Sequence, residues 1–347
     1  MKLAPLTLKK IKRFRSIKRG YYSLLIFCFM LLITIFAELW INNRALLVYY
    51  EGHVYFPTYG AMTPGNTFGL EYDYETNYRD LQKKIELEEG NNFLVMPLVP
   101  YNAFEMDLRD TEFPPFSPSW KDKHYLGTDA IGRDMVARLV YGFRVCITFS
   151  LFLLVITFAI GIALGCLMGY WGGKFDLFFQ RLIEIWSSIP FLYIIMIIAS
   201  IVVPNLTILV LVSVLFGWMG LTWYMRTATY KEKARDYVMA AKALGASNNR
   251  IIFYHILPNT ISLIVTFVPF SVAGGISGLT ALDYLGFGLP PPTPSWGELL
   301  QQGTTNLQAI WIISSTVTAL VVVMVSITFI GEAVREGFDP KLHSTFE

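Results

Sequence analysis

Few residues of this 347-residue chain have the types and spacing that chemistry requires. The nearest approach to a phosphate-binding loop is Gly172-Gly173-Lys174. Such a loop needs a serine or threonine after the lysine to hold magnesium, and an earlier glycine to open the turn. This chain has Phe175 and Met168 at those two positions. We therefore expect that the chain binds no cofactor, hydrolyses no ATP and is not itself an enzyme.

The remaining reactive side chains are scattered. The histidines are too dispersed for a metal site, and the cysteines lie in apolar runs: His53, His124, His255, His343, Cys28, Cys146 and Cys166. At the edges of the apolar runs lie Glu38 and Glu184, and Arg181 is placed to form an ion pair with Glu184. A proton relay in an ion-coupled transporter or channel remains an alternative function. A membrane-embedded enzyme would need a convergent nucleophile, base or metal cluster, which the sequence does not indicate.

The most distinctive polar segment runs from Tyr237 to Asn259, between two apolar runs. Helical periodicity places four side chains of its first part on one face: Tyr237, Val238, Ala241 and Leu244. Gly245 can adopt the left-handed conformation that ends a helix, and Ser247 or Asn248 can cap a second helix over Arg250–Leu257. The segment is expected to form a rigid hook that is presented to a partner.

The predicted contact residues of the hook are Tyr237, Ala240, Ala241, Leu244, Gly245 and Ala246. The alanines keep the first helix slim enough to enter a groove, and the chain is expected to leave the hook through Leu257 and to change direction at Pro258. A solvated loop is the alternative interpretation. A DNA-binding helix-turn-helix is disfavoured because both ends of the unit are pinned to the apolar runs, and nucleic acid is not an expected partner.

The elements that hold the hook are membrane spans. The chain is 54% hydrophobic and 16% charged, which is typical of a polytopic membrane protein. A span takes roughly 20 apolar residues, and six runs are long enough. We predict spans at Tyr21–Trp40, Val145–Gly169, Leu182–Val203, Leu206–Tyr224, Ile261–Leu282 and Ile310–Ile330. The fold class is therefore an all-α polytopic membrane protein with six transmembrane helices.

The distribution of Lys and Arg predicts the orientation of these spans. Residues 1–19 contain eight basic residues and no acidic one, so the N-terminus is expected in the cytoplasm. Six crossings return the C-terminus to the same side. They also place residues 225–258 in the cytoplasm, where six Lys or Arg residues outnumber two acidic ones. The predicted protein is a multi-pass membrane protein with both termini in the cytoplasm.

Several features of the spans and of the segment between the first two spans predict local structure. Gly161, Gly165 and Gly169 share one helix face and permit close packing. Pro190 and Pro269 lie inside the third and fifth predicted spans and should bend them, either as static kinks or as a moving gate.

The polar segment 41–143, between the first two predicted spans, has fifteen acidic residues against nine basic ones, and a hairpin is expected around Glu51-Gly52. These features predict a small extracytoplasmic insert with short β structure.

Two blocks of residues resemble a known family. Ala240-Ala241, Gly245 and Leu257-Pro258 match the EAA loop with which permeases of binding-protein-dependent ABC importers dock on their ATPase, although Met239 replaces an acidic residue and His255 an aliphatic one. A longer set resembles dipeptide and oligopeptide permeases: Leu126-Gly127-Thr128-Asp129, Gly132-Arg133-Asp134, Arg138, Tyr141-Gly142-Phe143-Arg144, Leu285-Gly286-Phe287-Gly288-Leu289-Pro290 and Pro294-Ser295-Trp296-Gly297. These motifs cover residues 124–340.

The sequence of the insert resembles one particular group within this family. Leu46–Gly52 and Tyr55–Pro57 are similar to the Yej-type permeases, whose transporters carry oligopeptides and microcin C. The resemblance implies a type I ABC importer permease fold. The predicted parts are a basic N-terminus (1–20), a first span (21–40), a periplasmic insert (41–123), a lead-in segment (124–144), a five-helix permease domain (145–335) with its coupling loop (225–258), and a C-terminal tail (336–347).

The resemblance also implies the function and the partners. The chain would be a permease subunit in the cell inner membrane, translocating oligopeptides, with peptide-nucleotide antibiotics of the microcin C type as a further class. Its partners would be a homologous second permease, ABC ATPase subunits that bind ATP and Mg, a periplasmic peptide-binding protein, the peptide substrate and membrane lipid. The hook would transmit the motion of the ATPases to the membrane helices.

Overall fold

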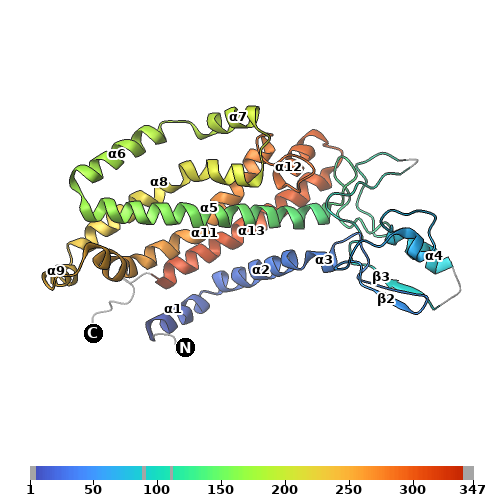
Figure 1. The fold of residues 1–347 in the computed structure, drawn as a ribbon, viewed down its shortest axis with the longest axis horizontal. Coiled ribbons are helices and arrows are strands. Elements are labelled where there is room, and N and C mark those ends of the chain that lie inside the picture. Colours follow the sequence, from blue (N-terminus) through green and yellow to red (C-terminus); the bar gives the residue numbers. More distant parts are fainter. Residues whose placement is uncertain (1–4, 88–90, 110–111, 339–347) are drawn as a thin grey trace.

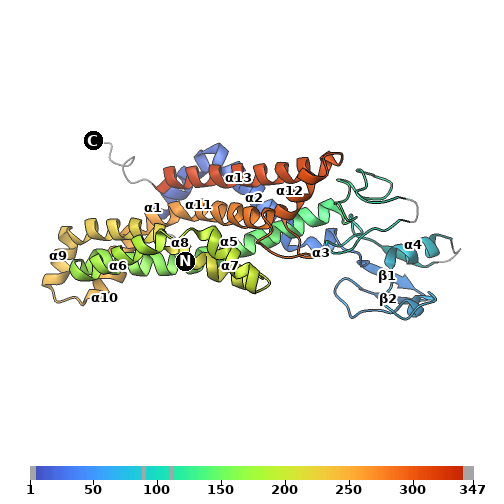
Figure 2. The same cartoon turned by 90° about the horizontal axis from the view of Figure 1, so that it is seen from above.

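The computed structural model describes residues 5–87, 91–109 and 112–338, and it is an elongated helical bundle with a small unit containing β-strands at one end (Figure 1). The opposite end carries helix α9 (Asp236–Ala243) (Figures 1 and 2). We call these the insert end and the hook end. The insert means residues 41–123 throughout.

Among the described residues, five helical runs are long and apolar enough to cross a membrane. They are α2 (Lys18–Ile35), α5 (Met135–Trp171), α8 (Leu206–Lys233), the run Asn248–Tyr284 and α13 (Ile310–Phe338). Four of them extend beyond the predicted spans, because the helical backbone continues past the apolar residues that mark a span in the sequence. The first is followed by the short helix α3 (Ala37–Trp40).

The third predicted span is divided into two helices at Pro190, the position where a bend is predicted. Helices α6 (Gly173–Ser187) and α7 (Phe191–Ile201) are bent by 66° at a short break, and only if the pair counts as one span does the number of spans reach six. Pro190 lies at this break as the residue before α7. It has no N–H to donate, and it disfavours helical backbone in the preceding residue, so the helix stops there.

Close contact between α5 and α8 organises the bundle. A β-carbon added at Gly161, Gly165 or Gly169 would lie 2.5–3.0 Å from atoms of α8. At Gly165 it would lie 2.6 Å from the β-carbon of Met225 and 2.7 Å from the carbonyl oxygen of Thr222. The predicted glycine face is therefore confirmed, and only glycine permits this approach of the two backbones.

The hook differs from its predicted form on the C-terminal side. A three-residue helix, α10 (Asn248–Arg250), passes through a π-helical turn, η2 (Ile251–Ile256), into α11 (Leu257–Tyr284), so the backbone is helical throughout. The helical backbone continues through Pro258 without a break. Pro258 sits at the start of α11 and the wide turn lies directly before it, where the missing N–H of proline is accommodated. Pro269 lies inside α11.

The insert contains a three-stranded antiparallel sheet in the order β2-β1-β3. The predicted hairpin is confirmed: β1 (Leu47–Tyr50) pairs with β2 (His53–Tyr55), and Glu51 and Gly52 form the turn with φ of 48° and 81°. Strand β3 (Phe93–Val95) was not predicted, because three residues are too few to reveal alternation. With a 3-10 turn, η1 (Gly65–Phe68), and helix α4 (Tyr78–Leu87), the sheet encloses a small core.

A second, separate core joins the insert to the bundle. It contains Ile41, Val99, Tyr101 and Ala103 of the insert together with Ala137 of α5. Ile41 and Val99 form an isolated β-bridge, so the segment that enters the sheet unit and the segment that leaves it lie side by side. The sheet unit is therefore connected to the bundle through one narrow neck.

Two further helices were not predicted. Helix α1 (Pro5–Ser16) occupies the basic N-terminal segment, and α12 (Trp296–Thr305) follows the proline-rich loop after α11. The predicted C-terminal tail, residues 336–347, lies outside the described residues from position 339 onward.

The α5–α8 contact yields a stability prediction. We expect Gly165→Ala to lower the free energy of unfolding by about 1–3 kcal/mol, because its methyl group would overlap the Met225 side chain and the Thr222 backbone. Gly220→Ala is the matched control in α8, since no atom lies within 4 Å of its β-carbon position. The measurement is the thermal unfolding midpoint of each purified variant. Equal midpoints for the two variants would contradict the close-packing argument.

Candidate functional site

The hook is a short helix closed by a hydrogen-bonded turn. Gly245 has φ of +80°, and two backbone bonds of 3.0 Å close the end of α9, from Ala246 N to Ala241 O and from Gly245 N to Lys242 O. This pair of bonds is a Schellman motif, which requires the left-handed residue. Ser247 caps the next turn by accepting from the Arg250 N–H. The hook is therefore a defined unit and not an irregular loop.

One side of the hook is anchored in the bundle. Val238 and Ala241 are buried with Ile251, Ile252 and Ile256 of the π turn, and this cluster continues into α5 and α8. The Tyr170 hydroxyl of α5 donates to Asn248 Oδ1 over 2.9 Å. The hook thus contacts the two helices of the glycine interface and the start of α11.

The opposite side of the hook is exposed. Leu244 is 89% exposed and Met239 54% exposed, although both are large apolar residues. Ala240, Gly245 and Tyr237 are exposed as well, and Ala246 is half-buried. The four side chains predicted on one face are therefore divided, because Val238 and Ala241 face the bundle. Of the six predicted contact residues, Ala241 supports the hook from the inside.

The start of α9 is fixed by Tyr237. Its hydroxyl donates to Glu232 Oε2 on α8 over 2.7 Å. Partial burial, together with this carboxylate, raises the pKa of Tyr237 to about 12. The phenol therefore remains protonated and keeps its donor role at any physiological pH.

The neighbouring helices hold α8 at the base of the hook. Arg226 of α8 forms two hydrogen bonds with Asp176 of α6, of 2.5 and 2.6 Å. The predicted Arg181–Glu184 ion pair on α6 is present at 2.6 Å. An overlooked pair joins Arg144 of α5 to Glu38 of α3 at 2.7 Å. The carboxylate noted at the edge of the first span thus connects two helices.

At the insert end, a buried charge network joins two of the sequence motifs. Glu298 of α12 accepts from Arg133 over 2.6 Å and also from Arg138, and Arg133 bonds to Asp129 over 2.6 Å. The two arginines are 1% and 0% exposed. We call these four residues the junction network. The sequence motifs contain Asp129, Arg133 and Arg138 but not Glu298, the partner that these buried charges require.

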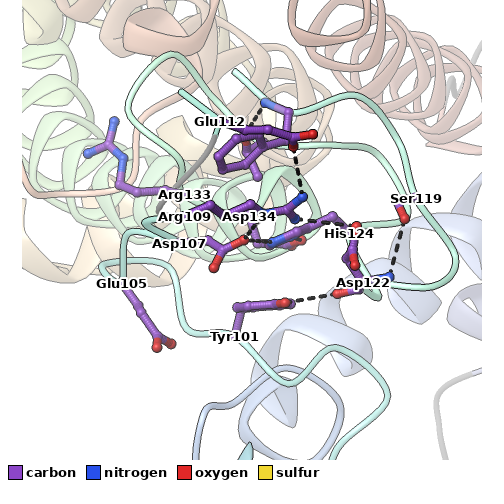
Figure 3. Close-up of polar contacts among 12 residues, drawn as sticks. Tyr101, Glu105, Asp107, Arg109, Glu112, Ser119, Asp122, His124, Arg133 and Asp134 are labelled. Atoms are coloured by element: carbon purple, nitrogen blue, oxygen red, sulfur yellow. Dashed lines mark hydrogen bonds and ion pairs between the residues drawn. The ribbon is translucent and has the colours of Figure 1, made fainter. Parts of the chain in front are cut away.

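A second cluster connects the insert to the first residue before α5 (Figure 3). The buried His124 ring lies between Asp134 Oδ2 at 2.8 Å and Asp107 Oδ2 at 3.3 Å, and it stacks on Tyr101. Asp134 also caps α5 by accepting from the Ala137 N–H. Burial raises the pKa of Tyr101 to about 12, so its hydroxyl stays protonated and donates to the Asp122 carbonyl.

The loop after α11 is ordered by one carboxylate that lies outside the sequence motifs. Asp283 is buried and accepts from the Leu289 N–H over 2.7 Å and from the Ser295 hydroxyl over 2.5 Å. Trp296, which follows Ser295, is 1% exposed, and its indole N–H donates to the Leu139 carbonyl of α5 over 2.9 Å. The motif residues of this loop therefore fasten α11 and α12 to α5.

No metal site accompanies these clusters. Among the described residues, no group of three or more His, Cys, Asp and Glu side chains could hold a metal ion. The structure therefore offers two kinds of arrangement: buried charge networks at the insert end, and an exposed apolar surface on an anchored unit at the hook end. The second arrangement is suited to binding another macromolecule.

Comparisons with known proteins identify the class. Residues 161–344 match the family described as binding-protein-dependent transport system inner membrane component. The chain belongs to this family of ABC transporter permeases. It is 40% identical to the inner membrane ABC transporter permease protein YejE of Escherichia coli (strain K12) over 339 residues, covering 98% of both chains. The resemblance to Yej-type permeases is thereby confirmed.

Other relatives lie in the same group. A peptidoglycan transport system permease protein YejE of Agrobacterium fabrum is 34% identical over 363 residues, covering 97% of this chain and 94% of the relative. The dipeptide transport system permease protein DppC of Lactococcus lactis is 34% identical over 223 residues, covering 64% of this chain and 65% of the relative. The two Yej-type matches therefore extend over nearly the whole chain, insert included.

The junction network predicts a large cost for removing its shared carboxylate. We expect Glu298→Gln to destabilise the chain by about 3–5 kcal/mol, because the buried guanidinium of Arg138 loses its carboxylate partner and that of Arg133 keeps only Asp129. Glu184→Gln is the matched control at an exposed ion pair and should cost less than about 1 kcal/mol. Thermal unfolding of both purified variants measures the difference. A similar midpoint for both would show that the network contributes no more than a surface pair.

Proposed function

We propose that this chain is a permease subunit of an ATP-driven, binding-protein-dependent importer that carries oligopeptides across the inner membrane. The observation that carries the proposal is the hook, because it presents exposed Leu244 and Met239 on a unit whose other side is anchored to the membrane helices. Such a surface fits docking on an ATPase subunit. The printed names of the relatives, which include dipeptide and peptidoglycan transport permeases, support a peptide-type substrate.

The proposed topology places the hook and both termini in the cytoplasm and the insert in the periplasm. The assembled importer would contain a homologous second permease, ATPase subunits that bind ATP and Mg, and a periplasmic peptide-binding protein. The contact residues of the hook would be Tyr237, Ala240, Leu244, Gly245 and Ala246, and Ala241 would hold them in place.

The proposed mechanism uses the continuity of the hook with its two flanking helices. The chain enters α9 from α8 and leaves it through a helical run into α11. Closure of the ATPases would displace the hook, and its buried contacts would pass the displacement to α8 and α11. ATP must bind one conformation of the complex more tightly than the other, because equal affinity shifts no population.

Reconstitution tests this function against the ion-coupled alternative. Peptide uptake into proteoliposomes is measured with and without the ATPase subunits and the binding protein. The proposal requires uptake that depends on ATP and on both partners. Uptake by the purified chain alone, indifferent to ATP, would identify a secondary transporter or channel.

The hook surface gives a specific prediction. We expect Leu244→Asp to weaken binding of the ATPase subunit at least tenfold, since an exposed apolar anchor is replaced by a charge. Its unfolding midpoint should match the wild type, because Leu244 is 89% exposed in the part of the chain that the structure describes. Leu307→Asp is the control: Leu307 is 78% exposed and lies between α12 and α13. Unimpaired ATPase binding by the Leu244 variant would remove the hook from the interface.

We further propose that the insert receives the binding protein or caps the periplasmic mouth of the pathway. Its sheet unit can be excised at the neck, where Asn42 N donates to Val99 O over 3.1 Å, and the excision also removes Arg79 and its contacts with Pro100 and Glu105. Replacing residues 43–98 by a short Gly-Ser linker should abolish stimulation of ATP hydrolysis by the binding protein, while the ATPase subunits stay bound. Full stimulation of the excised variant would show that the sheet unit has neither role.

A further inference from the structure

A cleft of about 480 Å³ opens at the hook end between three membrane helices. Tyr224 of α8, Ser262 and Thr266 of α11, and Arg335 of α13 line it, with Phe267 and Phe270 forming its apolar wall. We call it the arginine cleft. Arg335 is three residues from the described end of α13, and Ser262 lies in the second turn of α11. The cleft therefore lies near the end of the bundle and not at its centre.

Three hydrogen-bond donors of the cleft have no partner within the described residues. Thr266 donates to the Ser262 carbonyl over 2.8 Å. The hydroxyls of Tyr224 and Ser262 and the guanidinium of Arg335 form no hydrogen bond or ion pair with any described residue. Glu332, one turn earlier on α13, is paired with Arg19. One permanent positive charge and two free hydroxyls from three helices thus border one cavity.

This combination of groups selects the chemistry of a ligand. A guanidinium has only donors and keeps its charge, and its planar fork matches a carboxylate or a phosphate. Hydroxyls can add further donors to the same oxygens, and the aromatic wall would exclude water from one side. An arginine at the end of a span commonly reaches the headgroup layer, which brings lipid phosphate within the same class of ligand.

We propose that the arginine cleft binds one oxyanion, held by Arg335 with the hydroxyls of Tyr224 and Ser262. Since α8 and α11 flank the hook, an oxyanion bound between them and α13 would respond to displacement of the hook. The role of the site rests on the proposed function: the oxyanion is the carboxylate of a peptide leaving toward the cytoplasm or the phosphate of an anionic lipid headgroup.

The first test measures binding without transport. Inorganic phosphate should raise the thermal unfolding midpoint of the purified wild-type chain in a concentration-dependent way. Arg335→Gln should lose this shift and Arg335→Lys should retain part of it. Arg15→Gln, which removes an exposed arginine on α1, is the matched control and should keep the full shift. An equal phosphate shift in Arg335→Gln and wild type would overturn the site.

The second test separates the two sources of the oxyanion. The complete importer is reconstituted in phosphatidylcholine alone or mixed with phosphatidylglycerol, and uptake of a tripeptide is compared with uptake of its C-terminal amide. If the oxyanion is a peptide carboxylate, Arg335→Gln should lower uptake of the free acid about tenfold, because a hydrogen bond to a charged group is lost. Uptake of the amide should not change. For the phosphate of an anionic lipid headgroup, only the stimulation by phosphatidylglycerol should disappear, because choline neutralises the phosphate of phosphatidylcholine.

The remaining outcomes also decide the proposal. An equal loss of both peptides in both vesicles would mean that Arg335 is only structural, and it would overturn the oxyanion site. If the wild-type importer carried neither peptide, the proposed function would fail, and the phosphate measurement on the purified chain would alone decide whether the cleft binds an oxyanion.

Discussion

The backbone contact between α5 and α8 is the constraint on which the rest of the structure depends. Three glycines one turn apart let the two helices approach so closely that no other residue fits. Helix α5 runs from the insert end to the hook end, capped by Asp134 at its start and bonded through Tyr170 to the hook near its other end. Helix α8 leads directly into α9. The two helices therefore form one unit that joins the insert end to the hook end.

Sequence patterns predicted those elements whose causes are local. The glycine interval, the Glu51-Gly52 turn and the Ser247 cap each act within a few residues, and each has the predicted structure. Helix ends and short elements were less accessible. A helix stops at Pro190, whereas the helical backbone continues through Pro258. Which of the two happens depends on the turn beside the proline. A π turn of this kind leaves no periodic signal in the sequence.

The candidate site was predictable in position but not in orientation. Periodicity placed Val238, Ala241 and Leu244 on one face, yet the first two are buried and the third is exposed. A helix of eight residues turns only about twice, so its interior side is chosen by the helices it rests on, which the sequence does not reveal. The partner of Arg133 and Arg138 was missed for a related reason, since Glu298 lies 160 residues away from Arg138.

The bent pair of helices α6 and α7 is attached to the same unit by contacts with α8. Trp186, near the end of α6, donates its indole N–H to the Leu215 carbonyl of α8 over 2.9 Å. Its ring and that of Phe191, the first residue of α7, both contact Phe216. The break is therefore held from both sides by one turn of α8, while Asp176 ties the other end of α6 to Arg226 near the hook. Contacts at both ends of α6 therefore attach it to α8, the helix that leads into the hook.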